Sequence, residues 1–176
     1  INAEQVAAVE HITRKDGMVK VVTGMAGTGK TTMLRTAAEA WIQEKISVIG
    51  AAIAGKAARG LEAGSGIKSF TIAKLLMDLE KPGPLPPPRV LVIDEAGMVG
   101  TRQMLRVVDH CETKDIKLVL VGDAKQLQPV EAGGPFPAIA ARHGEVQLTQ
   151  IVRQREEWSR ESVHAVAEGR ASDALR

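Results

Sequence analysis

The chain has 176 residues, of which 44% are hydrophobic, and its formal net charge is only +2. This length suits one domain with a substantial core, and the apolar content excludes a disordered chain. The single cysteine excludes a disulfide framework and fits a reducing cytosol, and the lack of an apolar run of about 18 residues predicts a soluble protein without membrane contact. The weak net charge permits local contact with an anion but does not by itself predict nucleic-acid binding.

The first two predicted elements lead into a glycine-rich stretch. Residues 2–9 are a predicted helix that is capped by Asn2 and has Val6 and Val9 on one side. Residues 18–23 are rich in β-branched side chains and predict a strand, whereas residues 32–40 favour a helix. The stretch that separates this strand from this helix is therefore a strand-to-helix turn.

That turn, Gly24-Met25-Ala26-Gly27-Thr28-Gly29-Lys30-Thr31, fits the phosphate-binding pattern G-x-x-x-x-G-K-[ST] without a mismatch. Its glycines allow backbone N–H groups to turn inward around a phosphate, and the following helix adds the positive end of its dipole. Lys30 is predicted to bind the β- and γ-phosphates, and the Thr31 hydroxyl to ligate Mg²⁺. The predicted nucleotide-binding residues are Gly24, Ala26, Gly27, Thr28, Gly29, Lys30, Thr31 and Thr32. The alternative is a glycine-rich turn that binds nothing.

The middle of the chain alternates strand and helix. Residues 46–53 predict a second apolar strand, residues 55–61 a short helix that the glycines at 64 and 66 interrupt, and residues 71–79 a helix with apolar side chains at helical spacing. Proline lacks an N–H group and restricts the residue before it, so the proline-rich residues 81–88 predict an exposed loop.

Two acids, Asp94 and Glu95, follow the continuous apolar run of residues 89–93. In a protein with a phosphate-binding loop, one carboxylate at such a strand end holds Mg²⁺ and its neighbour orients the attacking water. We assign Asp94 to the metal and Glu95 to the water. The alternative is a solvated strand end, but the phosphate-binding loop in the same chain favours the catalytic interpretation. Two adjacent acids also favour hydrolysis, because GTPase-type switches usually lack the second one.

The remaining elements complete an α/β pattern. Residues 101–113 predict a helix, residues 117–121 an apolar strand, residues 135–142 a helix and residues 146–148 a short strand, with a last helical segment over about 155–168. Strands that alternate with helices predict a doubly wound, mainly parallel sheet with helices on both faces and a ligand site at the strand C-terminal ends. After the strand at 117–121, Gln126 can hydrogen-bond a γ-phosphate or the attacking water.

In this order the motifs resemble those of superfamily 1 DNA helicases of the RecD-like branch, and most closely the helicase part of Ti-type conjugative transfer relaxases. The residues that carry the resemblance, besides the phosphate-binding loop, are Gln5, Asp94-Glu95-Ala96-x-Met98, Gly122-Asp123-x-x-Gln126-Leu127-x-Pro129-Val130 and Leu148-Thr149-x-x-x-Arg153-Gln154. The resemblance implies a RecA-like P-loop NTPase fold, ATP and Mg²⁺ as cofactors, Gln5 as the reader of adenine, and Arg153 as an arginine finger on the γ-phosphate.

The resemblance also implies contacts with single-stranded DNA. Lys56 matches a segment that meets a DNA phosphate, and Thr71 belongs to a Thr-Ile-His signature in which this chain has Ala73 in place of histidine. The hydroxyl contact that relatives make is missing at Ala54. Single-stranded DNA also needs stacking surfaces, and Phe70 and Phe136 are candidates because each lies beside a motif, Phe70 in a predicted loop and Phe136 at the start of the predicted helix over residues 135–142. The alternative for each is ordinary core packing, the fate we expect for Trp41.

By this resemblance, residues 1–176 are one RecA-like ATPase domain, the first motor domain of a bacterial cytoplasmic 5′-to-3′ helicase. The resemblance places a second RecA-like domain elsewhere in the same parent chain, together with any nicking domain, because relaxases nick with tyrosine and this chain has none. The expected partners are single-stranded DNA, that second domain and other conjugative transfer proteins. The alternative is a nucleotide-binding interaction module of a DNA-transfer complex that has no motor activity.

Overall fold

Within residues 1–14, 16–79, 88–123 and 134–151, which the computed structural model describes, six strands form one sheet. The helices are α1 (Ala3–Thr13), α2 (Lys30–Gln43), α3 (Gly55–Ser65), α4 (Ile72–Leu79), α5 (Thr101–Thr113) and α6 (Phe136–His143). The strands are β1 (Val19–Gly24), β2 (Val48–Ala52), β3 (Ser69–Thr71), β4 (Val90–Ile93), β5 (Lys117–Gly122) and β6 (Glu145–Leu148), and the 3₁₀ helix η1 (Ala96–Met98) follows β4. The strand order is β3-β2-β4-β5-β1-β6, and every neighbouring pair is parallel.

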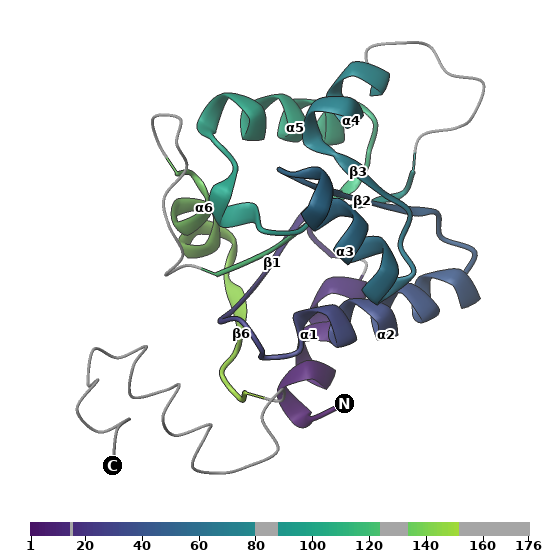
Figure 1. The fold of residues 1–176 in the computed structure, drawn as a ribbon, viewed down its shortest axis with the longest axis vertical. Coiled ribbons are helices and arrows are strands. Elements are labelled where there is room, and N and C mark those ends of the chain that lie inside the picture. Colours follow the sequence, from purple (N-terminus) through teal and green to yellow (C-terminus); the bar gives the residue numbers. More distant parts are fainter. Residues whose placement is uncertain (15, 80–87, 124–133, 152–176) are drawn as a thin grey trace.

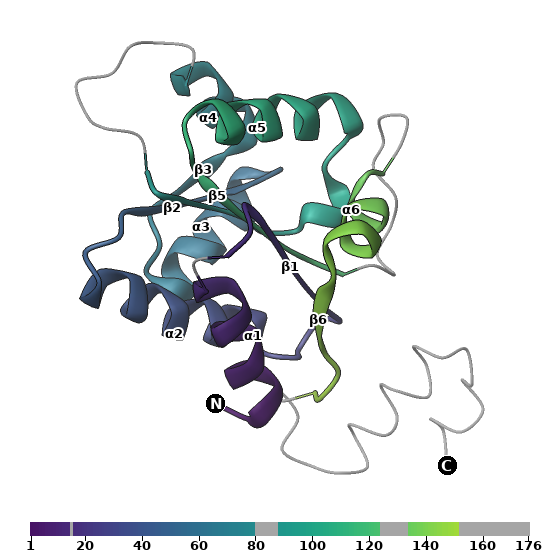
Figure 2. The same cartoon turned by 180° about the vertical axis from the view of Figure 1, so that it is seen from behind.

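Helices cover both faces of this sheet because successive apolar residues of each central strand point to opposite sides. Leu91 and Leu118 pack into a cluster with α4, α5 and α6, whereas Val92 and Val119 pack into a cluster with α1, α2 and α3. Figures 1 and 2 show α4 and α5 on one side of the sheet and α1 and α2 on the other. The predicted doubly wound fold is confirmed.

The three strands that precede the main motifs lie side by side as β4-β5-β1. Because the strands are parallel, their carboxyl ends meet at the same edge of the sheet, and this edge carries the residues that follow each strand. The phosphate-binding loop after β1 and the acids after β4 are far apart in the sequence and are therefore brought to the same edge of the sheet.

Most predicted elements occur with shifted ends. The helix expected over residues 2–9 continues to Thr13, and its buried residues are Gln5, Ala8 and Ile12, while Val6 is 40% exposed. The helix expected over residues 55–61 continues to Ser65, and β3 was not predicted. Trp41 is 2% exposed, as expected of a core residue. The predicted loop at 81–88, except for Pro88, and the predicted helix at 155–168 lie outside the described residues.

Two further observations concern the core and the surface. Cys111 is buried among the α5 contacts to the sheet, and this burial raises the pKa of its thiol to about 12, so the thiol stays protonated and unreactive at neutral pH.

Among the described helices, none combines the length and the apolar character that crossing a bilayer requires.

Candidate active site

A cavity of about 410 Å³ lies where the carboxyl ends of β1, β4 and β5 meet. Its wall brings together the phosphate-binding loop, the start of α2 and the residues that follow β4 and β5. The lining residues are Ala26, Gly27, Gly29, Lys30, Thr31, Thr32, Asp94, Glu95, Gly122 and Asp123. The sequence analysis assigned the phosphate-binding loop and the two acids to one site. In the structure they line the same cavity.

The loop is built by two glycines in the left-handed region of backbone conformation. Gly27 has φ 86° and Gly29 has φ 81°, values that residues with a side chain rarely adopt. Thr28 closes a tight turn inside the loop, because its N–H and its hydroxyl both donate to the Met25 carbonyl, at 3.4 and 2.9 Å. Gly29 is the N-cap of α2 and offers the first turn no side-chain hydrogen bond. The first N–H groups of α2 are therefore available to an anion in the cavity.

Lys30 folds back over this loop. Its Nζ donates to the Gly24 carbonyl at 2.5 Å and to the Met25 carbonyl at 2.8 Å. Burial lowers the pKa of the Lys30 ammonium, and the charges of Asp94, Asp123 and Glu95 act in the opposite direction. Its two carbonyl acceptors are neutral, so a phosphate in the cavity would offer the ammonium a stronger partner.

Asp94 and Glu95 differ in their surroundings although they are adjacent. Burial raises the pKa of the Asp94 carboxyl, against the opposing effects of the Glu95 N–H and the Lys30 charge. The Glu95 N–H donates to Asp94 Oδ1 at 2.9 Å. Glu95 itself has φ 54°, a left-handed conformation that costs a residue with a side chain on the order of 1–3 kcal/mol. The surrounding fold holds this strain at a carboxylate in the cavity wall.

The segment after Glu95 packs directly against the end of β5. A Cβ atom built on Gly122 would lie 3.1 Å from the Gly97 backbone nitrogen, and one built on Gly97 would lie 3.0 Å from the Asp123 carbonyl oxygen. A side chain at either position would force the neighbouring backbone to shift by a few tenths of an ångström, so glycine suits this close approach. The sequence analysis quoted Asp123 but gave it no role, although it lines the cavity; its position directly after an apolar strand is the signal that could have identified it. Gln126 and Arg153 lie outside the described residues, so their approach to this site stays a prediction.

Phe136 packs against Gly97 and Gly122 in the core, so the prediction that it contacts DNA is wrong. Its side chain is 0% exposed at the start of α6, and its ring would lie 3.0 Å from a Cβ on Gly122. A ring without exposed surface cannot stack on a base. Phe136 instead fills the core beneath the two backbones that form one wall of the cavity.

Gln5 braces the phosphate-binding loop in this structure. Its Oε1 accepts a hydrogen bond from the Asn2 N–H at 3.0 Å, and its Nε2 donates to the carbonyls of Thr28 and Gly29 at 3.4 and 3.3 Å. The side chain is 2% exposed, so the amide is engaged on both sides. Reading of adenine by Gln5 stays a prediction, and it requires the amide to leave these carbonyls.

Glu4, the neighbour of Gln5, ties α1 to the segment that follows β6. Its carboxylate accepts hydrogen bonds from the Thr149 N–H at 2.7 Å, the Thr149 hydroxyl at 2.5 Å and the Gln150 N–H at 3.0 Å. Burial acts to raise the pKa of Glu4, but these hydrogen bonds outweigh burial and the pKa is lowered. The N-terminal turn of α1 thus contacts both the phosphate-binding loop and the residues that lead to Arg153 (Figure 2).

Replacing Glu4 with glutamine is expected to lower the free energy of unfolding by about 1 kcal/mol or less at pH 7, since these hydrogen bonds lie near solvent. A carboxyl whose pKa is lowered by folding stabilises the protein above its unfolded pKa, and this stabilisation is lost as the pH falls through the folded value. The difference in free energy of unfolding between wild type and Glu4→Gln, from urea melts, should therefore shrink as the pH falls below the unfolded pKa of about 4.3. Glu10→Gln, at an exposed position of the same helix, is the control. A difference that persists unchanged at low pH would contradict this account.

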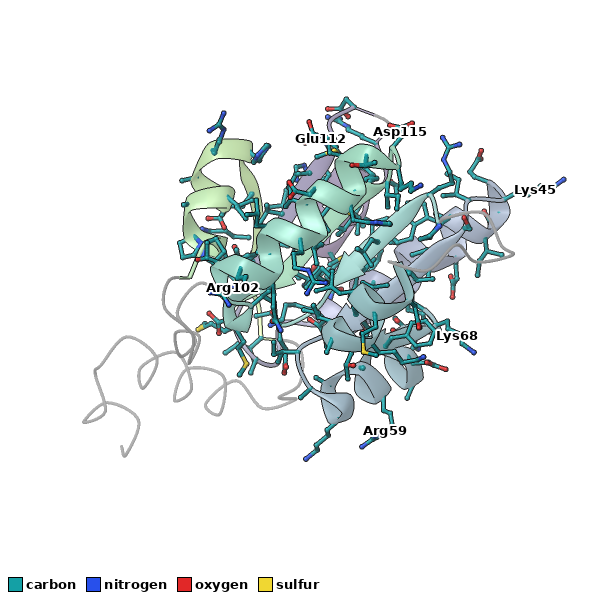
Figure 3. The ribbon with its side chains drawn as sticks, turned by 90° about the horizontal axis from the view of Figure 1, so that it is seen from above. Lys45, Arg59, Lys68, Arg102, Glu112 and Asp115 are labelled. Atoms are coloured by element: carbon teal, nitrogen blue, oxygen red, sulfur yellow. The ribbon has the colours of Figure 1, made fainter. Side chains whose placement is uncertain are left out.

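The residues predicted to contact DNA lie at the same edge of the sheet but outside the cavity wall. Lys56 is exposed in the first turn of α3, and Thr71 ends β3, where its hydroxyl accepts from the Lys74 N–H at 3.2 Å. Phe70 lies on β3 and not in the predicted loop; its half-buried ring has the ammonium groups of Lys68 and Lys74 at 6.0 and 5.6 Å from its centroid. Figure 3 shows Arg59 and Lys68 extending outward into solvent.

A divalent cation fits the chemistry of the cavity. Thr31 and Asp94 both line it, and a hydroxyl together with one carboxylate leaves positions for water and phosphate oxygens, the set that Mg²⁺ prefers. The described residues contain no group of three or more His, Cys, Asp and Glu side chains that could hold a metal without such additional ligands. The donor set is thus suited to a cation that arrives with a nucleotide.

The chain is similar in sequence to several known proteins. A family model described as an AAA domain matches residues 1–176. The conjugal transfer protein TraA of Rhizobium radiobacter is 44% identical over 176 residues, which cover 99% of this chain and 16% of TraA. The ATP-dependent RecD2 DNA helicase of Deinococcus radiodurans is 34% identical over 142 residues, which cover 76% of this chain and 19% of RecD2. The chain thus spans less than a fifth of the length of these relatives.

Two solved structures share the fold. The crystal structure of Bacteroides Pif1 bound to single-stranded DNA has a TM-score of 0.68 at 21% identity and covers 99% of this chain and 48% of that one. The Pif1 helicase from Candida albicans has a TM-score of 0.71 at 23% identity and covers 94% of this chain and 44% of that one. At these identities the likeness establishes the architecture, which is that of a RecA-like domain.

Proposed function

The chain belongs to the AAA domain family, as a superfamily 1 helicase motor domain of the RecD-like branch related to TraA, and from this premise we propose that it binds and hydrolyses ATP to drive 5′-to-3′ movement along single-stranded DNA during conjugative transfer. The observation that carries the proposal is the cavity in which Lys30, Asp94 and Glu95 meet. Its chemistry is that of phosphoryl transfer, in which the protein contributes positioning and electrostatic stabilisation.

The residues that would hold magnesium and ATP are those of the cavity wall. The loop N–H groups and the Lys30 ammonium would bind phosphate oxygens, and Thr31 and Asp94 would hold the cation. When bound, Mg²⁺ and ATP supply the neutralising charge and the bond that is cleaved. Glu95 would orient the attacking water and accept its proton on a carboxylate oxygen, and Gln126 and Arg153 would contact the γ-phosphate.

We further propose that this chain is the first of two RecA-like domains in a longer bacterial cytoplasmic protein, with nucleotide bound between them. The share of TraA and RecD2 that the chain covers supports a longer parent. Single-stranded DNA would contact Lys56, Phe70 and Thr71, and other conjugative transfer proteins would be partners of the parent. The direction of movement is inferred from the RecD-like resemblance alone and is tested by comparing unwinding of duplexes with a 5′ tail and with a 3′ tail.

The test is Mg²⁺-dependent ATP hydrolysis with and without single-stranded DNA. This chain is expected to hydrolyse ATP slowly, because half of the catalytic cleft would come from the second domain, and the protein that contains both domains is expected to be at least about tenfold faster with DNA. Glu95→Gln is the matched control, since it keeps the shape of the side chain and nucleotide binding but removes the base. Equal turnover by the two proteins would contradict the two-domain proposal, and hydrolysis by both proteins that ignores DNA would favour an interaction module instead.

A further inference from the structure

We propose that Gly64, near the end of α3, is a positioning residue for Thr31, whose hydroxyl is the proposed magnesium ligand. This inference rests on the proposed nucleotide site and extends it to a helix that does not carry one of its motifs. The sequence analysis treated Gly64 only as a helix breaker, yet it lies inside α3 with an ordinary helical backbone.

The first observation is a steric one. A Cβ atom built on Gly64 would overlap Thr31 Cγ2, so α3 approaches the first turn of α2 as closely as a glycine allows. Nearby Arg35 donates from Nε to the Gly64 carbonyl at 2.9 Å, which fixes α3 against α2 at this point. The two helices are thus held in contact where α2 presents its proposed metal ligand.

The second observation is a cavity of about 610 Å³ between α2 and α3. It shares Thr31, Thr32, Asp94 and Glu95 with the nucleotide cavity, and Gly64 and Arg35 also line it. A side chain added at residue 64 would therefore enter a cavity whose wall is partly that of the nucleotide cavity.

The consequence for Thr31 follows from its branched side chain. The methyl and the hydroxyl are both attached to Cβ, and the side chain has a single rotatable bond to the backbone. If the methyl is pushed away by a side chain at residue 64, rotation about that bond also displaces the hydroxyl. The other escape, a shift of α3 away from α2, breaks the hydrogen bond from Arg35. Glycine at residue 64 therefore leaves the Thr31 hydroxyl where the cation needs it.

The experiment measures binding of a fluorescent ADP analogue to this chain with Mg²⁺ and with EDTA. Wild type is expected to bind more tightly with Mg²⁺, and Gly64→Ala is expected to lose about tenfold to a hundredfold of that Mg²⁺-dependent gain, as when a group that orients a metal ligand is altered. Gly60→Ala is the matched control in the same helix, because a Cβ there meets no atom within 4 Å. It should keep the gain and raise the melting midpoint by about 2–4 °C through helix propensity.

Thr31→Ser separates a positioning role from general damage, because serine keeps the hydroxyl and lacks the methyl. In the Thr31→Ser background, Gly64→Ala should leave the Mg²⁺-dependent gain unchanged and should not lower the melting midpoint, because the clash is gone and alanine favours the helix. In the wild-type background it should lower both. An unchanged gain in Gly64→Ala, or a loss that Thr31→Ser does not relieve, overturns this inference alone. Absence of any Mg²⁺-dependent binding by wild type would overturn the proposed function together with it.

Discussion

Replacing Lys30 with alanine is expected to reduce Mg²⁺-dependent ATP hydrolysis by about a thousandfold and to abolish unwinding by the protein that contains both motor domains. In the structure the Lys30 ammonium reaches the loop carbonyls of Gly24 and Met25 and lines the cavity with Asp94 and Glu95. No other cation among the described residues lines that cavity, so the developing negative charge would lose its nearest counter-charge. The measurement is steady-state hydrolysis alongside nucleotide affinity.

The fold is expected to survive this change. Burial lowers the pKa of Lys30, which means that folding disfavours its charged form, so the ammonium is a stability cost and not a support. Lys30→Met keeps the length of the side chain and removes the charge, and its melting midpoint should equal or exceed that of wild type. Substantial hydrolysis by either variant would refute the assignment of Lys30, whereas a large drop in melting midpoint would show that the ammonium holds the loop together.

Replacing Phe136 with alanine is expected to lower the free energy of unfolding by about 3–5 kcal/mol, the range for removing a buried aromatic ring. The ring is 0% exposed and fills the space below Gly97 and Gly122, which a smaller side chain leaves empty. Urea unfolding of the chain measures this loss, and Phe136→Leu should recover most of it because the volume is largely kept. The affinity of the Phe136→Ala variant for single-stranded DNA, measured at a urea concentration well below its unfolding transition, should equal that of wild type.

Phe70→Ala is the matched comparison, because Phe70 is half-buried at the edge strand β3 between two lysines. This variant should cost little stability and should weaken binding of single-stranded DNA by the two-domain protein, as expected when one stacking surface is removed. If Phe136→Ala instead weakened DNA binding while leaving stability unchanged, the core assignment of Phe136 would fail.

Local pattern was sufficient for most of the fold. The apolar runs of β4 and β5 predict parallel strands because both of their faces are buried, and the helix at 101–113 has the predicted bounds. β3 was not predictable in this way. Its three residues, Ser69, Phe70 and Thr71, show no apolar run, and they are a strand only because the edge of β2 is available to pair with them.

Local pattern likewise predicted only part of the candidate site. The phosphate-binding loop and the two acids were predictable together, because parallel strands bring their carboxyl ends to one edge. The burial of Phe136 was not, since it depends on how α6 packs against η1 and β5. The contact of Gly64 with Thr31 depends on how closely two helices approach, which no local pattern of residues records.

The placement of β1 between β5 and β6 sets an order on how the protein can be made. Val19 pairs with Leu118 and Val22 pairs with Val146, so the strand that carries the phosphate-binding loop has both neighbours far downstream. During translation this strand leaves the ribosome before either neighbour and has no partner in the sheet until β5 has been made. Its apolar side chains meanwhile lack the neighbours that bury them, so we expect the phosphate-binding loop to reach its final shape only after β5 and β6 have paired with β1.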